Sequence, residues 1–539
     1  MRNLIFLCIF SILLPPVSMA ETSECAYPQE LDRYRLLRRL SMDLRLQSPS
    51  YEEYLALDGQ NDVPESIIDG YLDSEAFRIS ARRFHEDLFW PAVTNVSIAD
   101  VAVVLAPGKQ GALYSVLGAS RRKMWRKGSG SEICGNWKQE EFNSDGSPIP
   151  KIIENDNGGL LYLQDGYVEV EPYWAPGTTV KVCAFDAQTA EVGLKGPCNI
   201  LRSKTDPKCG CGPNLRACYS AGTSPFSNDG VVPTILRSLR EQLLLVVDDY
   251  TSGGEAYSQL LTTKRTYWNG AIAHWKKYLA QMTNLNKTYN ALDSSEAALP
   301  EEIVFTDTNW QKSERADPHA GVVTLPAFTL RFQTNRGRAN RFRVAFTSQY
   351  FVPPADPNDI GCDPLAEDLT QRCVCRKCHQ VLEPLAAYFG GVSEAGSSLI
   401  ADEELFPHYS EICDPTKNPK PPINCGRFYV TSPGSHNPGS LFPYQFADID
   451  DPLHKTIAAN LAAGPAAWGK VIIENGQFHS AIIRHLFRHL MGRNLILDPT
   501  RDDSELELLT DLTSQFKTHD SFKSMVKTLV MLPQYRRVR

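Results

Sequence analysis

Basic residues are not in excess in this sequence. Its 55 lysines and arginines are outnumbered by 63 aspartates and glutamates, which gives a formal net charge of −8 at pH 7 over 539 residues. A nucleic-acid-binding protein needs clustered positive charge to neutralise phosphates. The composition therefore argues against a nucleic-acid partner, and it indicates no other partner that charge alone would recognise.

The chain also lacks the short motifs of several common enzyme classes. It contains no Walker loop, no HExxH zinc motif, no nucleotide-binding glycine pattern and no Ser/His/Asp motif. It has no low-complexity tract and no evident fixed-period repeat. With 42% apolar and 22% charged residues it is typical of a folded globular protein, and its length allows several globular units.

Long apolar runs are missing as well, apart from one short stretch at the start. Arg2 precedes an apolar stretch over residues 4–14, and Ser18, Met19 and Ala20 then place small residues two positions apart. This pattern is typical of a secretory signal peptide over residues 1–20, with an uncleaved anchor as the alternative. A membrane span needs about 20 apolar residues, so we expect no transmembrane segment after cleavage. The sequence thus predicts an exported protein that is periplasmic, on the cell surface or secreted.

Cysteine is plentiful, and the expected compartment decides how it is used. One of the 14 cysteines lies in the signal sequence, and the odd number that remains would meet an oxidising environment in which disulfides persist. The run that contains Cys209, Cys211 and Cys218 has no nearby histidine, which favours disulfides over a metal-thiolate site. Three short-loop pairs are candidates: Cys183 with Cys198, Cys362 with Cys373, and Cys413 with Cys425.

Residue spacing predicts helices near the start and a strand-rich segment after them. Four leucines fall on one helical face, and a Ser-x-x-Glu capping box follows them. Alternating residues over 160–163, 167–170 and 178–185 predict strands of a small insertion. The leucines and the capping box are Leu36, Leu37, Leu40, Leu44, Ser50 and Glu53.

Four further expectations concern single segments. We expect a helix over about 267–282, an extended segment within 322–350, and Asp520 as the N-cap of the last helix. His85 lies in a predicted helix, where we expect a half-buried packing residue rather than a ligand.

One pentapeptide carries recognisable chemistry. Cys375, Arg376, Lys377, Cys378 and His379 have the Cys-x-x-Cys-His spacing of c-type haem attachment. Two thiols three positions apart on one helical turn can each bond to a vinyl group of the haem, and the next residue can present its imidazole to the iron. We therefore expect one haem c, tethered by the two cysteines, with His379 as an axial ligand of the iron.

Two interpretations without haem use the same residues. Cys373 lies two residues before the motif, where it can compete in a disulfide or join Cys375, Cys378 and His379 as a zinc set. Three sulfur ligands so close in sequence crowd a tetrahedral site, which normally draws its ligands from two separated pairs. A disulfide within the motif is therefore the stronger rival.

The sequence does not identify the second axial ligand of the iron. Methionine and histidine are the usual choices, and methionine raises the potential. Our candidates are Met491, His485 and His489, although the two histidines, four positions apart beside an apolar arc, can equally form a half-buried packing pair. If no side chain reaches the iron, the open position would allow oxygen or peroxide chemistry.

A cluster of arginines precedes the motif. Such a cluster is usually a solvated face, but next to a haem it can hold the propionates through charge-assisted hydrogen bonds. Its members are Arg336, Arg338, Arg341 and Arg343.

Several segments together resemble a known group of exported planctomycete and myxobacterial proteins, which combine cytochrome-c-like sequence with helical domains of unknown function. Residues 36–44 resemble the first domain of this group and residues 238–271 resemble a second helical domain. Residues 321–384 are similar to the haem-motif domain, and residues 478–493 resemble the C-terminal domain. The resemblance implies an exported, largely helical, haem-carrying protein, while the biochemical activity of the group is poorly defined.

The chain departs from the pattern of that group at one informative place. The haem-motif domain commonly reads Cys-His-x-x-Met-Asp-Pro, whereas Leu382 and Glu383 precede Pro384 here. Any role of the methionine is therefore lost. The segment 127–230 lies outside the resemblance.

These observations predict a mainly α fold. We expect several helical domains, including a cytochrome-c-like haem-motif segment, and a small β-containing insertion rich in cysteine. The expected units are a signal peptide (1–20), an N-terminal helical domain (21–126), the insertion (127–230), a helical domain (231–318), the haem-motif domain (319–451) and a C-terminal helical domain (452–539).

The predicted function is that of an exported monohaem c-type cytochrome-like protein. It would transfer one electron to or from a periplasmic or surface redox partner protein. One alternative is a disulfide-stapled, non-catalytic scaffold that binds exported proteins or glycans. The other is a haem enzyme with an open distal site, and no catalytic activity follows from the sequence.

Overall fold

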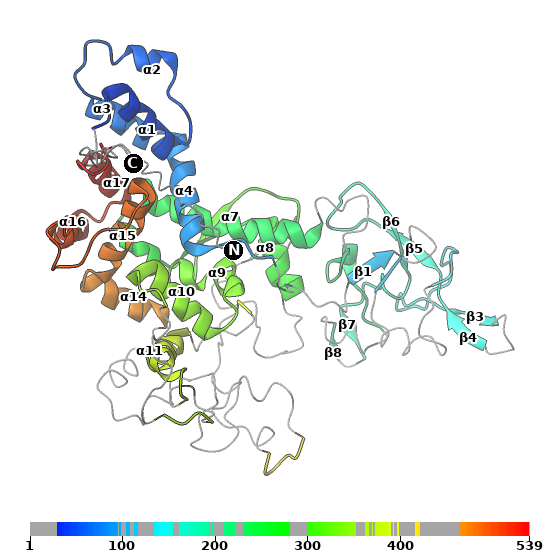
Figure 1. Ribbon diagram of the computed structural model, residues 1–539. Helices are drawn as coiled ribbons and strands as arrows, with labels where there is room; N and C mark the ends of the chain where they lie inside the picture. The colour runs from blue at the N-terminus through cyan, green and yellow to red at the C-terminus, as the bar shows by residue number, and fades with distance from the viewer. Residues whose placement is uncertain are drawn as a thin grey trace, which may run out of the picture.

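A computed structural model of the chain is mainly helical, as the sequence predicts. Figure 1 shows the helices gathered in one body and most of the strands, β1 to β8, in a separate group beside it. The predicted signal peptide lies outside the described residues. The structure describes residues 30–94, 96, 98, 104–107, 113–116, 134–154, 161–194, 196–198, 206, 208–220, 230–280, 299–300, 302–317, 319–351, 362–365, 369, 372–389, 392, 396–397, 415–420 and 464–537.

The first helices form because apolar residues recur on one face and polar residues cap the ends. In α1 (Arg33–Arg45) the four predicted leucines are buried, and Asp32 accepts hydrogen bonds from two amides of the first turn. The predicted capping box of Ser50 and Glu53 begins α2 (Tyr51–Leu55). The next helices are α3 (Glu65–Leu72) and α4 (Glu75–Phe89).

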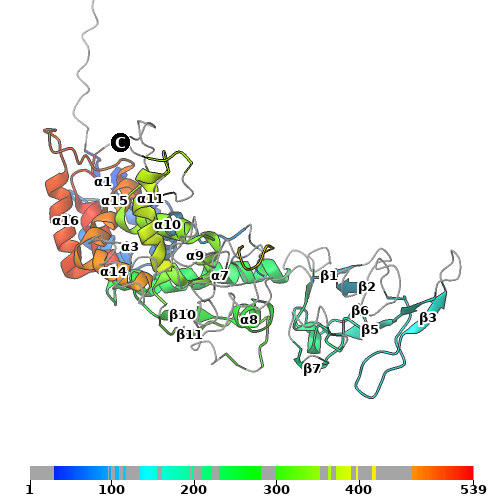
Figure 2. The same ribbon diagram turned by 90° about the horizontal axis from the view of Figure 1, so that it is seen from below.

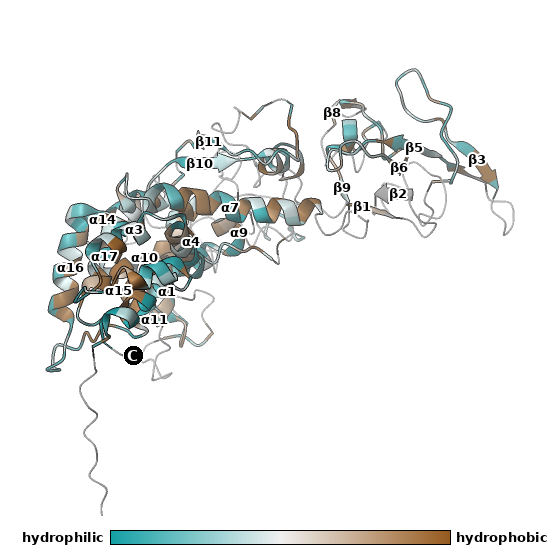
Figure 3. Ribbon diagram, turned by 90° about the horizontal axis from the view of Figure 1, so that it is seen from above, coloured by the Kyte–Doolittle hydropathy of each residue, from teal (hydrophilic) through white to brown (hydrophobic). Residues whose placement is uncertain are grey.

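The two ends of the described chain lie side by side. The Leu31 amide donates to the Arg536 carbonyl at 2.7 Å, and the Tyr535 hydroxyl donates to the Asp43 carboxylate at 2.9 Å. The C-terminal helices thereby pack on the N-terminal ones, and Figure 3 shows the hydrophobic α15 enclosed among them. These helices are α14 (Pro465–Glu474), α15 (Gln477–Met491), α16 (Leu506–His519) and α17 (Phe522–Met531).

The long helix α7 (Val231–Thr251) runs from the helical body toward the strands (Figure 2). Its predicted apolar stripe is buried at Leu239, Leu243 and Val246. No helix in the described part of the chain is long and apolar enough to cross a membrane. The elements that follow are η4 (Tyr257–Leu261), β10 (Arg265–Trp268), α8 (Gly270–His274), η5 (Trp275–Leu279), β11 (Gln311–Glu314), η8 (Val322–Thr324), α9 (Pro326–Arg331), α10 (Asn335–Thr347), α11 (Arg376–Ala386) and η9 (Ala387–Phe389).

One hydrophobic core joins the helices of all the predicted helical domains. Phe342 of α10 stacks on Trp468 of α14 with ring centroids 3.8 Å apart. Tyr257 of η4 lies against Phe478 of α15 and Phe522 of α17. The N-terminal, central and C-terminal helices therefore stabilise one another through shared burial of apolar surface.

The insertion carries a five-stranded sheet with the strand order β5-β6-β2-β1-β9. Pairs β5–β6 and β1–β2 are antiparallel, whereas β2–β6 and β1–β9 are parallel. The sheet begins before residue 127, because β1 and β2 precede that position. Its strands are β1 (Val104–Pro107), β2 (Leu113–Val116), β5 (Tyr167–Val170), β6 (Val180–Cys183) and β9 (Tyr219–Ser220), and two hairpins pair β3 (Lys151–Glu154) with β4 (Leu161–Gln164) and β7 (Val192–Gly193) with β8 (Gly196–Pro197).

Disulfides cross-link the strand-rich part of the chain and, separately, the loop before the motif. The predicted pair Cys362–Cys373 is confirmed, and the cysteines of the 209–218 run form disulfides as favoured. The predicted pair Cys183–Cys198 is wrong, because Cys183 ends β6 beside Cys134 and bonds to it. Cys413 and Cys425 lie outside the described residues. The four bonds are Cys134–Cys183, Cys198–Cys209, Cys211–Cys218 and Cys362–Cys373.

Three local predictions are wrong. The helix predicted over 267–282 starts only at α8, because Tyr267 lies in β10 and pairs with β11. The segment 322–350 holds η8, α9 and α10 instead of extended chain. Asp520 is the left-handed C-cap of α16, with a φ of 44°, and Ser521 caps α17.

Candidate functional site

Helix α11 positions the Cys-x-x-Cys-His motif. Cys375 stands at its N-terminal end, and the amides of Cys378 and His379 donate to the Cys375 carbonyl at 3.1 and 3.0 Å. The two thiols and the imidazole therefore leave the first turn of one helix, as attachment to a single haem requires. α11 packs along α10, which carries the arginine cluster.

The thiols of the motif are not bonded to each other. Cys375 and Cys378 are free and half-buried. Cys373 is bonded to Cys362 and is not available as a third sulfur ligand for zinc. The two sulfurs that haem attachment needs are thus reduced, and the competing sulfur beside them is already paired.

A buried carboxylate lies directly behind the imidazole. Glu383, one helical turn after His379, exposes only 2% of its surface. Its Oε1 lies 2.5 Å from His379 Nδ1 and 2.5 Å from Arg336 Nε, and Oε2 is buried with no hydrogen-bond partner among the described residues. A carboxylate this deeply buried requires charged or donor partners, and Arg336 and His379 provide them.

This contact decides which nitrogen of His379 can act as a ligand. Because the Glu383 oxygen accepts, a neutral His379 ring carries its proton on Nδ1 and has its lone pair on Nε2. Nε2 makes no hydrogen bond within the described residues, and the side chain is 20% exposed. Metal-ligating histidines typically donate their second N–H to a carboxylate or a carbonyl in this way.

Sequence reasoning missed Glu383. It treated the position only as a departure from the Met-Asp-Pro pattern of the resembling family. The signal was nevertheless present, since His379 and Glu383 are four residues apart in a predicted helix, where side chains meet.

The four arginines of the cluster divide into two faces of α10. Arg336 and Arg343, two helical turns apart, both reach α11. Arg336 binds Glu383, and Arg343 lies near the Cys378 thiol. Burial lowers the pKa of Arg343, and its Nε is buried with no partner among the described residues. A buried guanidinium with one unsatisfied nitrogen, in electrostatic interaction with the attachment thiol, is suited to an anionic propionate.

The contacts of Arg338 and Arg341 indicate a structural role rather than a contact with a propionate. The fully buried Arg338 donates to the carbonyls of Val392 at 3.1 Å and Gly396 at 2.9 Å. Arg341 donates to the Asp87 carbonyl at 2.9 Å and lies over the Trp90 ring at 4.2 Å. Their contacts join the loop after α11, and α4, to α10.

The three candidate distal ligands take part in packing on α15. His485 Nε2 donates to the Val344 carbonyl at 2.9 Å, and burial lowers the pKa of His485 to about 4. The His489 ring packs edge-on against Phe84 with centroids 5.6 Å apart. Met491 is 6% exposed and belongs to the hydrophobic core. Packing therefore accounts for His485 and Met491, whereas His489 is exposed, so the two histidines do not form the half-buried pair of the alternative.

His85 is more deeply buried than we expected. It is fully buried, with Nδ1 at 2.7 Å from the Ala81 carbonyl and Nε2 at 2.7 Å from the Tyr257 hydroxyl. Burial lowers its pKa to about 4. Both nitrogens are engaged, so His85 is a packing residue, as predicted, but fully rather than half buried.

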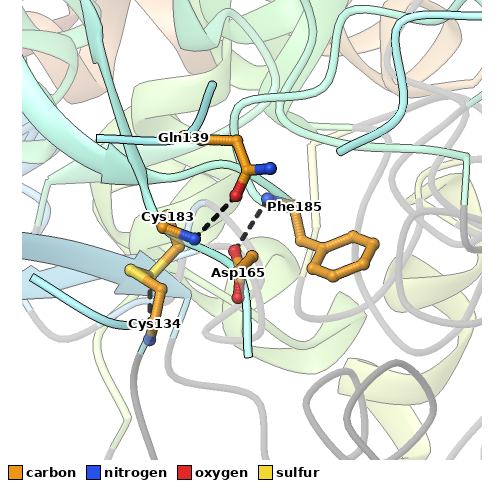
Figure 4. The surroundings of a disulfide bond; sticks show 6 residues. Cys134, Gln139, Asp165, Cys183 and Phe185 are labelled. Carbon is orange, nitrogen blue, oxygen red and sulfur yellow. Dashed lines mark hydrogen bonds between the residues drawn. A yellow bond between two sulfur atoms is a disulfide. The ribbon is translucent and has the colours of Figure 1, made fainter. Parts of the chain in front are cut away.

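The sheet contains a group that resembles a metal site in composition. Cys134, Asp165 and Cys183 cluster there, and they are the one such group among the described residues. Figure 4 shows that the two sulfurs form a disulfide and that the Asp165 carboxylate accepts from the Phe185 amide, at 3.0 Å. The sulfur and carboxylate atoms that could bind a metal ion are therefore already engaged within the protein.

The residues around α11 fit a covalently attached haem. They provide two free thiols on one turn, an imidazole whose Nε2 makes no hydrogen bond within the described residues, and an arginine with one unsatisfied nitrogen that interacts electrostatically with Cys378. Cys375 and Cys378 would hold the group, His379 would ligate the iron, and Arg343 would contact a propionate. Comparisons with models of protein families, with curated proteins and with solved structures find no match to this chain.

Proposed function

We propose that this chain is an exported monohaem c-type cytochrome-like protein that exchanges one electron with a redox partner protein. The observation that carries the proposal is the arrangement of α11, in which two free thiols and a carboxylate-held imidazole share one end of a helix. A bound haem supplies a one-electron iron couple. The remaining tasks fall to side chains of this protein.

Glu383 and Arg336 fix the imidazole. The carboxylate holds Nδ1–H of His379, which sets the ring orientation and makes Nε2 a more basic ligand. Arg336 compensates the buried negative charge of Glu383 and ties α11 to α10. Strong donation from such a histidine favours the oxidised, more positive iron, so the pair supports a low potential.

The surface next to the motif supports an acidic partner. Lys377 is exposed, and Arg372 and Arg376 are half-buried beside it. A cluster of positive side chains near the site of electron exchange attracts a negatively charged protein and raises the rate of encounter. The redox partner would thus present carboxylates around its own redox centre.

Export is part of the proposal. Its support is the signal-like start of the sequence and the four disulfides, which persist in oxidising compartments. Free thiols at Cys375 and Cys378 in such a compartment are consistent with consumption by haem attachment.

A second candidate function is a haem enzyme with an open distal position. It is favoured by the packing of Met491 in the core and by the hydrogen bond that His485 Nε2 donates to a carbonyl. Carbon monoxide added to the reduced protein distinguishes the two functions. An open iron binds the gas and its spectrum shifts, whereas an iron with two protein ligands does not respond.

The test of haem attachment uses paired variants of the full chain, produced with haem-maturation machinery. Cys375→Ala/Cys378→Ala should yield a protein without covalent haem by denaturing mass spectrometry. The matched control, Cys198→Ala/Cys209→Ala, also removes two sulfurs but should keep the haem, because that disulfide lies in the strand-rich insertion and not in the motif. Covalent haem retained in the first variant would overturn the proposal.

A further inference from the structure

A cavity lies at the β10–β11 hairpin, away from the motif. It has a volume of about 230 Å³ and is bounded by α7, both strands of the hairpin and the segment after α8. In the hairpin Thr266 pairs with Ser313 and Trp268 with Gln311. Since side chains two positions apart share one face of a strand, these four residues present hydroxyls, an amide and an indole to the same side.

Gln242 of α7 also lines this cavity, and one of its polar atoms is unsatisfied. The side chain is 1% exposed, and its Nε2 donates to the Tyr267 carbonyl at 2.5 Å and to Thr266 Oγ1 at 3.2 Å. The carbonyl can only accept, so Nε2 must face it and the amide cannot be flipped. Oε1 is then left buried without a partner among the described residues. Gln242 lines the cavity and its buried amide oxygen lacks a donor, which indicates a ligand that brings one.

The chemistry of the lining defines the class of ligand. The buried guanidinium of Arg315 donates to the Gly321 carbonyl and to Thr324 Oγ1, so it is committed to the protein. Lys312 at the hairpin lies 3.6 Å from the Asp249 carboxylate, which balances its charge. Lys276 and Glu314, which carry opposite charges, also line the cavity. The other lining residues bring hydroxyls, amides and an indole, and this set suits a neutral ligand that carries both hydroxyl groups and an apolar face.

The size of the cavity limits the ligand further. Pockets for drug-sized molecules measure about 300 to 1,000 Å³, so this one is smaller. It suits a single ring.

We propose that this cavity binds one neutral sugar ring, either a free monosaccharide or the terminal residue of a glycan. A ring hydroxyl donates to Gln242 Oε1, the hydroxyls of Thr266 and Ser313 exchange hydrogen bonds with others, and the Trp268 indole packs on the apolar face of the ring. The site uses no residue of the haem motif. Its failure and the failure of haem attachment are therefore separate results.

The test is isothermal titration of the full-length protein with D-glucose, D-galactose, D-mannose and N-acetyl-D-glucosamine, one at a time. A small ligand held by a few polar groups should bind with a dissociation constant on the order of 1 mM. At least one of the four sugars should give a saturable isotherm. An absence of saturable binding for all four overturns the proposal and leaves a cavity that holds water only.

Variants locate the binding. Gln242→Met removes the orphaned oxygen with little change in volume, and Trp268→Ala removes the indole. Each should weaken the sugar by about tenfold. Ser313→Ala, at the solvent-facing hairpin, is the variant least able to disturb folding and should weaken binding severalfold. Trp90→Ala is the matched control, because this 49% exposed indole does not line the cavity. Equal affinity in the three cavity variants and the control overturns the assignment.

Discussion

Replacing Glu383 with glutamine tests the role of the buried carboxylate behind His379. The substitution keeps the shape of the side chain and removes its negative charge. His379 Nδ1 and Arg336 Nε both lie 2.5 Å from the oxygen that would change. The imidazole then donates to a neutral amide oxygen and becomes a less basic ligand, and the Arg336 cation loses its counter-charge. Both effects destabilise the oxidised iron, so the potential should rise.

The expected size follows from comparable metal sites. Loss of a carboxylate that orients a metal-ligating histidine typically changes metal affinity 10- to 100-fold. For a one-electron couple each factor of ten corresponds to 59 mV, so the potential should rise by about 60 to 120 mV. Burial of Glu383, at 2% exposure, places the expected value in the upper part of that range, because solvent screens the charge little.

The assay is a spectroelectrochemical titration of the haem-loaded protein. The matched control is Glu474→Gln, which removes the same charge from an exposed position on α14 and should leave the potential unchanged within about 20 mV. A fall in potential for Glu383→Gln, or a shift no larger than that of the control, would refute the reasoning. Retention of the haem by mass separates a change of potential from a failure of attachment.

Three other predictions test the structure more widely. Burial lowers the pKa of His85 to about 4 and of His274 to about 3, so the unfolded chain takes up these protons first as the pH falls. The free energy of unfolding should therefore be greatest at pH values above the ordinary histidine pKa of about 6.5, and it should fall by about 2 kcal/mol per histidine by pH 5. A free energy of unfolding from urea denaturation that does not change with pH would contradict the burial. Cys362→Ser frees the Cys373 thiol beside the motif and should lower the yield of correctly attached haem, whereas Cys362→Ser/Cys373→Ser should restore it; equal yields would show that the thiol does not compete. Lys377→Glu should slow oxidation of the reduced protein by the anion ferricyanide severalfold at low ionic strength and not at 0.5 M salt, where the screening length is only about 4 Å. An unchanged rate would show that Lys377 has no part in electron exchange.

Local sequence signals predicted local structure well in this chain. The leucines of α1 and the capping box of Ser50 and Glu53 act within one or two turns, and they occur as predicted. The Cys-x-x-Cys-His motif is equally local, and its thiols and imidazole do share one helical turn. Such features depend on neighbours in sequence, so spacing suffices to identify them.

Features that depend on distant partners were missed. Tyr267 lies in a strand because it pairs with Lys312, 45 residues away. Cys183 forms its disulfide with Cys134 and not with Cys198, which is nearer in the sequence. Arg336 reaches Glu383 only because α10 and α11 pack together. Tertiary contacts of this kind override local propensity, and no single segment of sequence contains them.

The measurement that tests the central claim most directly is a reduced-minus-oxidised visible spectrum of the full-length protein, with its intact mass recorded under denaturing conditions. The account predicts a sharp reduced α-band and a mass increase of one haem. A protein produced with functional haem-maturation machinery that shows neither would contradict the account, and Cys375, Cys378 and His379 would then have no part in electron transfer.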